Sequence, residues 1–566
     1  METHPPTTLE QHPGGYISQL TFNSGEILNI NEDDIVVFVG PNNAGKSQAL
    51  RDIWTNCEYK RTTVIVSDIE IVKHNYNLQQ FLSSVSIVND RGTVRDFSGM
   101  GFSITCHVSR IQDNEKYYNS LSPVFVCYLD TMNRLSITSP PQTITRDAIK
   151  THPIHQLMTN SQYRRWLSNN FAKAFGSELV PHTQFGASIP LCIGSPVKLE
   201  NDFENEQERL EEYARILDTY KHVHNQGDGI KSFTGILLYL MIDYYCTYLI
   251  DEPESFLHPP QANILGRIIG ETLTSHQQAF ISTHSEEIIK GLMSVCPQRV
   301  KIVRITREED TNSFSVLENE KFNSIWNDPL LKYSNIMSSL FHKNVVLCES
   351  DSDCKMYSLI ESHLKKVAGQ YSETLFIHCG GKQRMAKIAT ALRSLNIEVK
   401  LIADIDVLND EGILRGITDA FEVDWNTING DYNTLASNLH SNKEKIIRGD
   451  FRNDLDRILA SSGDKELTKK EIEAINDLVR IESKWTALKK SGIAALPRGD
   501  AFSAFTRLNQ ILKDHKVFLV PVGELECFIK DVGGHGPEWT NRVLEAFPDL
   551  DNPVYDAMKG FINNIM

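Results

Sequence analysis

The sequence lacks the cysteine patterns that mark metal fingers and disulfide frameworks. Its 10 cysteines are scattered along 566 residues, with no C-x-x-C pair and no metal-finger spacing. In a chain of this length, that scatter predicts reduced thiols in a cytoplasmic protein. Internal repeats and low-complexity tracts are missing as well, which argues against a repeat architecture.

A long uninterrupted apolar segment is also missing. Residues 1–15 are polar and contain prolines, so we expect no signal peptide. The longest apolar run, residues 233–250, is interrupted by Asp243 and leads into an acidic motif. It therefore predicts a buried helix followed by a buried strand, and no membrane partner is expected.

Positive charge is in deficit, since 73 acidic residues against 57 Lys and Arg give a net charge of −16. This excludes a general attraction to nucleic acid, and a nucleic-acid binder of this composition needs a local basic groove. Acidic clusters can instead hold metal ions, whose charge the count ignores. With 41% hydrophobic and 9% aromatic residues, the chain is globular and long enough for about three or four domains.

Apolar strand-like runs alternate with helical stretches, which predicts an α/β fold. We place the main boundary near residue 340, between a domain of residues 1–340 and a domain of residues 341–566. An edge strand is expected at residues 16–22. Further strands are predicted at residues 35–39, 102–110, 124–129, 247–250, 279–282, 300–305, 344–348, 374–378, 399–403 and 517–521, and the first of these is expected to be buried on both faces.

Each domain carries a less regular insertion. Residues 142–226 form a partly helical one, and residues 412–510 form a charged, mostly helical one. Within the first, residues 205–222 predict a helix whose apolar residues have heptad-like spacing: Leu210, Tyr213, Leu217 and Tyr220. Local packing and a dimer-forming arm are equally weighted interpretations of this helix.

Residues 40–47 fit the pattern G-x-x-x-x-G-K-S between a buried strand and a helix expected from about Lys46. Glycines let backbone N–H groups wrap phosphates, Lys46 reaches the β- and γ-phosphates, and the Ser47 hydroxyl binds Mg²⁺. The motif thus predicts nucleoside triphosphate binding. The expected nucleotide-binding residues are Gly40, Asn42, Asn43, Gly45, Lys46 and Ser47.

Three further segments have the chemistry of an ATPase. Asp251 ends an apolar strand and can hold Mg²⁺ through water opposite Ser47, which leaves Glu252 to activate the attacking water. His284, just past a buried strand, can sense the γ-phosphate, although a lone histidine is more often a structural hydrogen-bonder. The turn at residues 226–232 opens a helix whose N-terminus can grip the phosphate of a nucleotide on a second protomer, through Gly229 and Ser232.

In this order, these parts resemble the ABC-type ATPase heads of the SMC, RecF and Rad50 kind. The run D-E-P-E-x-x-L-H-P at residues 251–259 is specific to that group, whereas the turn at residues 226–232 departs from the usual signature because no Leu-Ser precedes it. The resemblance implies ATP and Mg²⁺ as cofactors, and heads that work as dimers. Asn133 and Arg134 are candidates for a position near the nucleotide.

A second group of carboxylates follows residue 340. Glu349 ends a buried strand, Asp353 comes four residues later, and Asp404 and Asp406 follow another strand as D-x-D. Alternate residues of a strand face one side, so we expect Asp404 and Asp406 to point together. Carboxylates converging from adjacent strand ends suit Mg²⁺ or Mn²⁺, which can orient a water and neutralise a phosphate.

The order of these motifs resembles a TOPRIM fold. Between Glu349 and the D-x-D pair, Gly380 and Gly381 follow a strand and allow close backbone approach to a phosphate, with Lys382 next to them. The TOPRIM fold serves topoisomerases, primases and certain nucleases. Its first motif is usually Glu-Gly, and here Ser350 stands in the glycine position.

An ABC-type head followed by TOPRIM in one chain resembles the OLD (overcoming lysogenization defect) family of nucleases, over nearly the whole sequence. The resemblance implies that Glu524 and Glu526, alternate residues after the strand at 517–521, add late carboxylates to a second metal. It also implies a basic residue that stabilises the transition state, for which Lys530 and His535 are the candidates. The catalytic residues implied are Glu252, His284, Glu349, Asp404 and Asp406.

The resemblance implies an ATP-regulated, Mg²⁺- or Mn²⁺-dependent endonuclease that cuts DNA in antiphage defence, as a homodimer or higher homo-oligomer. The family includes relatives of the Gabija system and OLD-like effectors encoded beside retron reverse transcriptases, so such a complex is a candidate partner. Two alternatives stay open: a TOPRIM RNase acting on tRNA or other RNA, and an ATP-gated nucleic-acid clamp or scaffold with a degenerate TOPRIM site. Whether ATP triggers or restrains cutting is open as well.

A basic stretch inside the second insertion also has two interpretations. Its cations, with two aromatic residues among them, either track a nucleic-acid backbone or form a solvated helical face. The residues are Lys484, Trp485, Lys489, Lys490, Arg498, Phe505 and Arg507.

Overall fold

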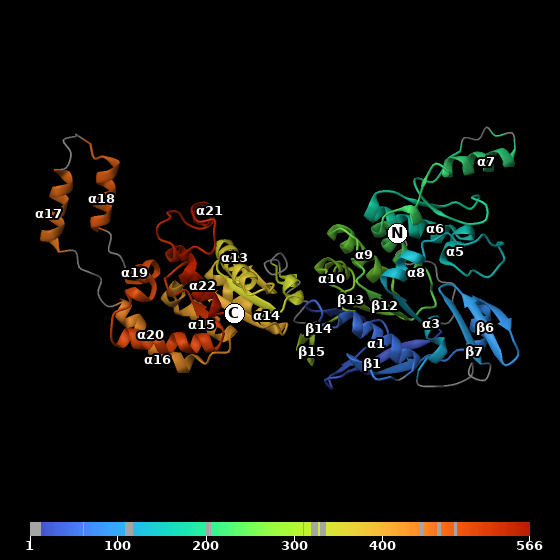
Figure 1. Cartoon of the computed structure of the whole chain (residues 1–566), viewed down its shortest axis with the longest axis horizontal. Helices are drawn as coiled ribbons and strands as arrows, with labels where there is room; N and C mark the ends of the chain where they lie inside the picture. Colours follow the sequence, from blue (N-terminus) through green and yellow to red (C-terminus); the bar gives the residue numbers. More distant parts are fainter. Residues whose placement is uncertain are drawn as a thin grey trace. The chain divides into compact units, whose positions relative to one another are not determined.

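The computed structural model describes residues 13–59, 61–107, 117–199, 203, 205–309, 311–317, 327–328, 335–440, 447–460, 466–479 and 484–566. The chain divides into two compact units, Met1–Ser324 and Ile325–Met566 (Figure 1). The division falls close to the boundary expected near residue 340, within a stretch that is mostly outside the described residues.

The first unit is organised around a six-stranded sheet of order β15-β14-β3-β13-β12-β8. All neighbours from β14 to β8 are parallel, and β15 is antiparallel to β14. The continuous apolar runs predicted as strands are buried here because helices cover a parallel sheet. The strands are β3 (Ile35–Val39), β8 (Val126–Leu129), β12 (Thr247–Asp251), β13 (Gln278–Ser282), β14 (Val300–Glu308) and β15 (Thr311–Leu317).

Helices of the first unit follow the strand ends. Helix α1 (Lys46–Glu58) packs on β12 and β13, and α8 (Asp228–Leu240) packs on α4 (Thr131–Ser136). Helix α9 (Pro259–Thr272) packs on α10 (Glu286–Met293). Because β3, β12 and β13 are parallel neighbours, the loops after them meet at one edge of the sheet.

The prediction of an edge strand at residues 16–22 is wrong. β1 (Gly15–Phe22) is the central strand of a sheet of order β2-β1-β4, antiparallel to both β2 (Ile27–Asn29) and β4 (Val66–Lys73). The weak apolar alternation indicates that one face of the strand is buried. It carries no information on how many neighbours the strand has, because β4 arrives from beyond α1.

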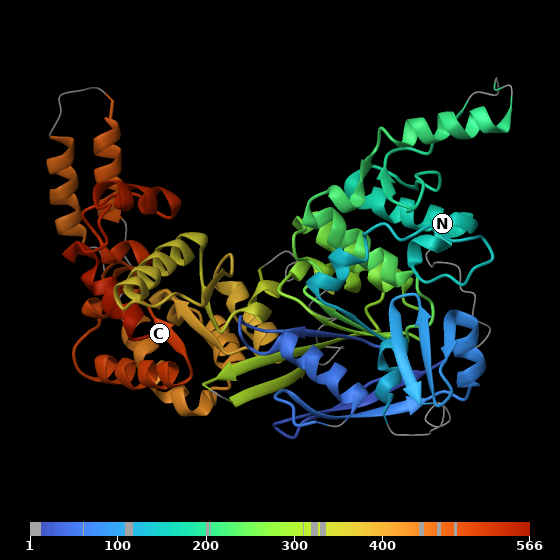
Figure 2. The ribbon, with the colours of Figure 1, turned by 45° about the vertical axis from the view of Figure 1, so that its right-hand side comes forward.

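Two small antiparallel sheets were not predicted, although one of their strands lies within the strand expected at residues 102–110. One has the order β5-β6-β7 and lies among the blue elements of Figure 2; its last strand ends at His107, and residues 108–110 of the predicted strand lie outside the described residues. The other has the order β11-β10-β9 and lies in the insertion. These strands are β5 (Ser86–Asp90), β6 (Val94–Gly99), β7 (Phe102–His107), β9 (Leu179–Pro181), β10 (Leu191–Ile193) and β11 (Lys221–His222).

The insertion also contains α5 (Pro153–Thr159), α6 (Ser161–Phe175) and α7 (Glu206–Leu217). Helix α7 is shorter than predicted, because the chain turns after it and pairs with β10. Tyr220 therefore lies off the helix, packs against Gly194 and donates a hydrogen bond to the Ser195 carbonyl at 3.0 Å. These contacts favour local packing for the C-terminal end of the predicted heptad face.

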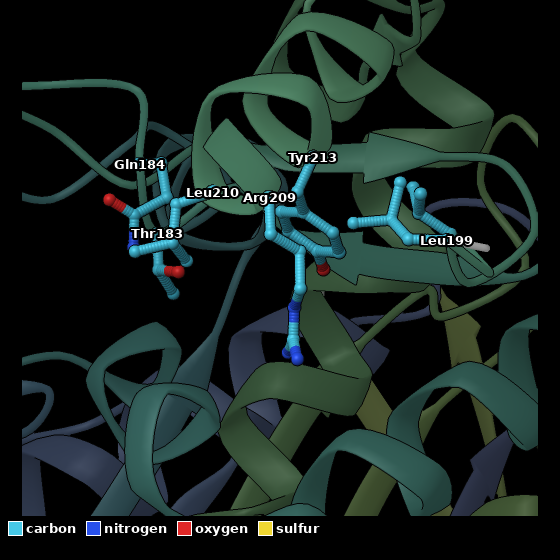
Figure 3. Close-up of a pocket in the computed structure, with 7 residues that line it drawn as sticks. Thr183, Gln184, Leu199, Arg209, Leu210 and Tyr213 are labelled. Atoms are coloured by element: carbon cyan, nitrogen blue, oxygen red, sulfur yellow. The ribbon is translucent and has the colours of Figure 1, made fainter. Parts of the chain in front are cut away.

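A pocket lies against α7 in the insertion (Figure 3). Residues from α7 and from the neighbouring loops line it, including Thr183, Gln184, Arg209, Leu210 and Tyr213. None of them is a predicted site residue.

The second unit contains a four-stranded parallel sheet of order β17-β16-β18-β19. Its strands are β16 (Asn344–Cys348), β17 (Thr374–His378), β18 (Val399–Ala403) and β19 (Val517–Leu519). Helices α13 (Asp351–Val367), α14 (Met385–Ser394), α21 (Pro537–Ala546) and α22 (Asp556–Asn563) follow these strands. Tyr357, Trp539 and Tyr555 belong to the apolar core that this layer shares with the sheet.

The insert between β18 and β19 is helical throughout its described part. Helix α16 packs on α20, and α17 packs on α18. The helices are α15 (Glu411–Ala420), α16 (Trp425–His440), α17 (Arg448–Leu459), α18 (Lys469–Val479), α19 (Lys484–Ser491) and α20 (Asp500–Asp514). Among the described residues of both units, no helix combines the length and the apolar character needed to cross a bilayer.

Candidate functional site

The loop after β3 has the backbone conformation of a phosphate cradle. Gly40 has φ 144°, and a Cβ there would lie 2.0 Å from the Ile305 carbonyl oxygen. Gly45, with φ 100°, turns the chain into α1, and Asn43 is also left-handed with φ 61°. Only glycine fits at Gly40 and adopts such angles without strain, so the sequence pattern and the geometry agree.

Lys46 begins α1 and is buried within this loop. Its Nζ donates to the carbonyl oxygens of Gly40 at 3.0 Å and Pro41 at 2.8 Å. Burial lowers the pKa of Lys46 to about 8, although the Glu252 and Glu254 carboxylates oppose that shift. An anionic ligand in the loop would compensate this desolvated ammonium group.

The acidic residues predicted after β12 meet the histidine predicted after β13. Asp251 is in register with Ser282, whose Oγ donates to the Asp251 carboxylate. The Glu252 N–H donates to the Ser282 carbonyl at 2.9 Å, and His284 Nε2 lies 3.5 Å from Glu252 Oε1. Burial and nearby Lys46 lower the pKa of His284, despite Glu252.

Glu252 has a left-handed backbone, with φ 47°. A non-glycine residue in that region is strained, and such strain persists only where the surroundings enforce it. Here the hydrogen bond from its N–H to β13 holds the turn. After this turn, the Glu252 carboxylate lies 3.5 Å from His284 Nε2.

Two further residues, Glu254 and Arg134, contact the predicted site residues at this edge of the sheet. Glu254 is half-buried, and the burial of its carboxyl group raises its pKa; its Oε1 accepts from the His284 N–H at 2.6 Å, and its Oε2 has no partner among the described residues. Arg134, fully buried, donates to the Asp251 carbonyl and lies 3.3 Å from Thr131 Oγ1. Asn133 instead bonds the Tyr128 carbonyl within its own turn. Glu254 belongs to the D-E-P-E motif, but the sequence alone does not distinguish it from a surface acid. Its burial and its hydrogen bond from the His284 N–H make that distinction.

The turn opening α8 lies against the acidic loop. A Cβ at Gly229 would lie 2.5 Å from the Phe256 carbonyl oxygen, so glycine lets the two backbones touch. Asp228 pairs with Lys231 at 2.7 Å and is exposed. Ser232 is fully buried, and its Oγ has no partner among the described residues. An approaching second chain would therefore meet Asp228 before Ser232.

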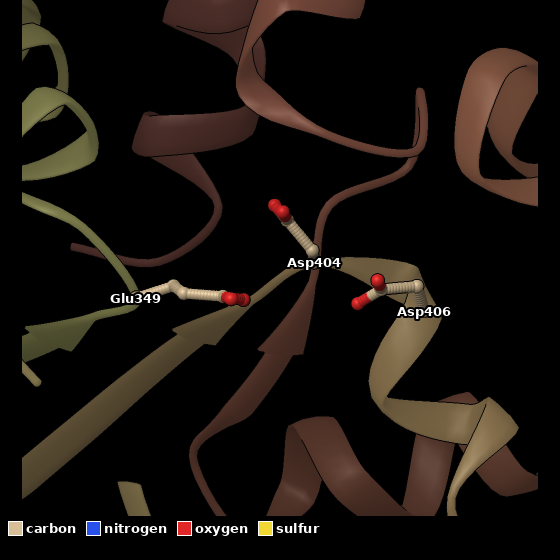
Figure 4. A group of neighbouring side chains, drawn as sticks. All are labelled: Glu349, Asp404 and Asp406. Atoms are coloured by element: carbon tan, nitrogen blue, oxygen red, sulfur yellow. The ribbon is translucent and has the colours of Figure 1, made fainter. Parts of the chain in front are cut away.

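In the second unit, three predicted carboxylates converge (Figure 4). Glu349, Asp404 and Asp406 each offer an oxygen, and these atoms all lie within 4.8 Å of one another. The sequence predicted that strand alternation would point Asp404 and Asp406 to the same side, and this is wrong. β18 ends at Ala403, Asp404 caps a 3₁₀ helix at Ile405–Asn409, and Asp406 lies within that helix. The turn, rather than strand alternation, brings both side chains to Glu349.

These residues fit a divalent cation of the Mg²⁺ or Mn²⁺ class. Glu349 Oε2 and Asp406 Oδ1 are buried without a partner among the described residues. Burial and the Asp406 charge raise the pKa of Glu349, and burial with Asp353 and Glu349 raises that of Asp404 well above its ordinary value. A hard cation satisfies carboxylate oxygens and offsets their mutual repulsion.

Comparisons with known proteins match both units. Residues 340–406 match the model "Overcoming lysogenization defect protein-like, TOPRIM domain", and residues 189–290 match "AAA domain, putative AbiEii toxin, Type IV TA system". This chain is an OLD-like ATPase–TOPRIM protein. The predicted family and the predicted α/β fold class, an ATPase head with a partly helical insertion followed by TOPRIM with helical additions, are confirmed.

A curated relative is the Old nuclease of Escherichia phage P2, 27% identical over 166 residues. The match covers 28% of this chain and spans 28% of that relative's length. Among solved structures, an Smc head bound to the winged-helix domain of ScpA is 15% identical with a TM-score of 0.34, covering 55% of this chain and 100% of that one. The SMC head domain from Thermotoga maritima is 13% identical with a TM-score of 0.28, over 54% and 99%.

Ser350, in the glycine position of this OLD-like TOPRIM motif, is a helix cap. Its φ of −122° is extended, so no glycine is needed. Ser350 Oγ accepts from the Asp353 N–H at 3.3 Å, and Asp353 Oδ2 accepts from the Ser350 N–H at 2.8 Å. Burial raises the pKa of Asp353. Asp353 thus secures the turn after Glu349, and its role as a metal ligand stays a prediction.

The late carboxylates are not alternate residues of a strand, contrary to expectation. β19 ends at Leu519, and a turn through Gly523, with φ 114°, separates it from Glu524 and Glu526. Glu526 Oε1 accepts from the Gly536 N–H at 2.7 Å and contacts His535 Nδ1. That contact engages one of the two candidates for the basic residue; the other candidate, Lys530, is exposed.

Two lysines contact the OLD-like carboxylate cluster instead. Lys382 Nζ lies 3.1 Å from Asp406 Oδ2, and Lys489 Nζ lies 3.4 Å from the same oxygen and 3.3 Å from Glu524 Oε2. Burial acts to lower the pKa of Lys489, but Asp406 and Glu524 outweigh it and raise the pKa. Both lysines were noted in the sequence, as part of a glycine turn and of a basic stretch. No local pattern placed them beside Asp406.

Proposed function

We propose that this chain is an ATP-regulated, divalent-cation-dependent endonuclease that cleaves DNA in antiphage defence. The observation that carries the proposal is the cluster of Glu349, Asp404 and Asp406, in which Glu349 Oε2 and Asp406 Oδ1 are buried without a partner among the described residues and suit a hard cation. The same chain carries an ATPase-type phosphate loop. A degenerate clamp would have no reason to keep three converging carboxylates with flanking lysines.

In this proposal, Glu349, Asp404 and Asp406 hold Mg²⁺ or Mn²⁺, which supplies a positive charge for the scissile phosphate and orients a water. Hydrolysis forms a bond from the water oxygen to phosphorus and breaks the bond to the bridging oxygen, which departs as a hydroxyl group with a proton that replaces the one lost by the water. Lys382 and Lys489 add positive charge beside the cation, where negative charge develops on the phosphate. Asp353 and Glu526 support this arrangement through the turns that they hold, and Glu524 supports it through its contact with Lys489.

The head acts as a nucleotide-dependent switch. Gly40, Asn42, Asn43 and Gly45 wrap the phosphates, while Lys46 exchanges its loop carbonyls for phosphate oxygens. Ser47 and Asp251 hold Mg²⁺, and Glu252 activates water. His284 contacts the γ-phosphate, and its Nε2 lies 3.5 Å from Glu252 Oε1. We assign Gly229 and the turn around it to contact with a second copy of the chain, which makes the active form a homodimer or higher oligomer.

Variants of the carboxylate cluster test the proposal. Asp404→Asn and Glu349→Gln are expected to abolish Mg²⁺- or Mn²⁺-dependent nicking of plasmid DNA, because each removes a charged ligand. Their binding of a fluorescent ATP analogue should match the wild type, since the head is a separate unit. Plasmid and labelled tRNA are incubated side by side, with and without ATP.

Wild-type protein that leaves plasmid intact under every cation and nucleotide condition contradicts the proposal. Cleavage of tRNA alone would reassign the substrate to RNA while keeping the chemistry. The comparison with and without ATP reports whether nucleotide triggers or restrains cutting. Adding a retron-type reverse transcriptase complex to the same assay tests the predicted partner.

A further inference from the structure

The ammonium group of Lys489 lies between two carboxylates of the second unit. Its Nζ is 3.4 Å from Asp406 Oδ2 and 3.3 Å from Glu524 Oε2. Asp406 belongs to the cluster with Glu349 and Asp404, whereas Glu524 lies beyond that cluster, on the loop after β19. Lys489 therefore occupies the space in which a cation shared by Asp406 and Glu524 would lie.

The backbone around Lys489 is built for this contact. A Cβ at Gly523 would lie 1.9 Å from the Lys489 carbonyl oxygen, and one at Gly492 would lie 2.1 Å from the Pro521 carbonyl oxygen. Both glycines have positive φ, 114° and 57°. The end of α19 and the loop that precedes Glu524 thus touch backbone to backbone, which only glycine permits.

Hydrogen bonds extend this contact to Asp406. The Ile493 N–H donates to the Pro521 carbonyl at 2.9 Å, and the Ile405 N–H donates to the Gly523 carbonyl at 3.0 Å. Ile405 is the neighbour of Asp406 on the 3₁₀ turn. Helix α19, the loop and the turn are therefore linked in series, and these backbone contacts hold the backbone of Lys489 beside the turn that carries Asp406.

A divalent cation and the Lys489 ammonium group exclude each other at this position. Mg²⁺ binds carboxylate oxygens at about 2.0–2.1 Å, so an ion bridging Asp406 and Glu524 would overlap Nζ and repel its charge. Glu526, the other late carboxylate, is engaged by His535 and the Gly536 N–H. In the cluster of Glu349, Asp404 and Asp406, one oxygen of Glu349 and one of Asp406 have no partner in the part of the chain that the structure describes.

We propose that Lys489 takes the place of a second divalent cation, so that the TOPRIM unit binds a single Mg²⁺ or Mn²⁺ among Glu349, Asp404 and Asp406. The lysine supplies the second positive charge from helix α19. This inference rests on the proposed phosphodiester cleavage for its purpose, but its central claim is the number of cations bound. It makes Lys489 a positioning and charge-supplying residue, delivered by the helical insert.

Calorimetric titration of the nucleotide-free full chain with Mn²⁺ tests this. The wild type is expected to bind a single Mn²⁺ that Asp404→Asn removes, which assigns the site to the cluster. Lys489→Met should gain a second Mn²⁺, because the freed carboxylates of Asp406 and Glu524 can then share an ion. Adding Glu524→Gln to Lys489→Met should remove that second ion again.

Two controls separate charge from structure. Lys489→Arg keeps the charge and should still bind a single Mn²⁺. Lys355→Met, which removes an exposed lysine paired with Asp351 at 2.7 Å, should leave the stoichiometry unchanged. Thermal unfolding of each variant checks that it is folded.

Either of two results overturns the inference: a wild-type chain that binds two Mn²⁺, one of them removed by Glu524→Gln, or a folded Lys489→Met variant that still binds a single ion. Plasmid cleavage is measured separately on the same samples. A chain that binds a single Mn²⁺ but cuts nothing would contradict the proposed function and leave the stoichiometry standing. A chain that cuts and binds two would contradict only the inference.

Discussion

At the scale of single residues, burial decides which charged groups have altered chemistry. Lys46 and Glu349 are both held in partly desolvated surroundings, and burial is the first cause of each shift in pKa. The shifts run in opposite directions because burial disfavours the charged form of each group. In both places a ligand of opposite charge would restore the charged form. The two sites are therefore poised for an anion in the head and a cation in the TOPRIM unit.

We expect the free energy of unfolding to depend on pH through Lys46. Its pKa is about 8 when folded and about 10.5 when unfolded, so the unfolded chain binds more protons between these values. Stability of the nucleotide-free protein should therefore gain from this group as pH rises from about 8 to about 10, and the desolvation penalty should be fully present below pH 8. Lys46→Met should flatten this part of the curve and abolish ATP binding.

The measurement is denaturant unfolding at several pH values, with and without ATP analogue. In saturating nucleotide the wild-type curve should flatten as well, because phosphates keep Lys46 charged. An unchanged pH profile in Lys46→Met would contradict the assigned burial of the ammonium group.

At the scale of elements, glycines set how closely loops approach the strand ends. Gly229 lets the first turn of α8 touch the loop after β12, and Gly523 lets the loop after β19 touch α19. Gly229 has no positive φ, so its requirement is space alone, whereas Gly523 needs both space and a left-handed backbone. In each case the glycine connects a helix to a loop that carries site carboxylates.

Gly229→Ala should displace the loop that carries Glu252. The new Cβ would lie 2.5 Å from the Phe256 carbonyl oxygen, and such overpacking costs about 1–3 kcal/mol of the free energy of unfolding. We expect ATP hydrolysis to fall more than ATP binding, because the phosphate loop is a separate segment. Hydrolysis, nucleotide affinity and thermal unfolding are measured together.

Gly430→Ala is the matched control, since no atom of the described residues lies within 4 Å of its added Cβ in helix α16. It should leave hydrolysis unchanged and stabilise the protein by up to about 1 kcal/mol, as expected in a helix interior. Equal effects of both substitutions on hydrolysis would contradict the role given to Gly229.

At the scale of the whole molecule, two α/β units carry chemically different sites. One edge of the six-stranded sheet gathers a phosphate loop, two acids and a histidine, and one edge of the four-stranded sheet gathers three carboxylates and two lysines. Both gatherings follow from the same rule, since loops after parallel strands meet at the carboxyl edge. Lys489 is the exception, because it comes from helix α19 of the insert. The proposed switch requires that nucleotide bound in the first unit alters cutting in the second.

A variant that binds ATP but does not hydrolyse it should accumulate as the proposed dimer. Glu252→Gln removes the group assigned to water activation and should slow hydrolysis without weakening ATP binding. The variant with ATP and Mg²⁺ is therefore expected to shift to twice the monomer mass by light scattering, as the turn at residues 226–232 meets the partner's nucleotide. Plasmid cleavage on the same sample reports the effect on the nuclease.

Asp228→Arg provides the control, because it changes an exposed residue of that turn without touching the phosphate loop. It should weaken ATP-dependent association of the Glu252→Gln background and preserve ATP binding. Glu252→Gln that stays monomeric with saturating ATP would contradict dimerisation through nucleotide.

The sequence by itself determined the two α/β units, the order of their motifs and most of the candidate site residues, because a phosphate loop and an acid after a buried strand are local patterns. It did not determine how many neighbours β1 has, or the conformation of residues 404–406 and 520–526, which depends on turns rather than strand period. Tertiary structure alone brought Arg134 to Asp251 and Lys489 to Asp406. Each of these contacts joins segments far apart in the chain, so the packing of their backbones determines which charged side chain lies beside each site carboxylate.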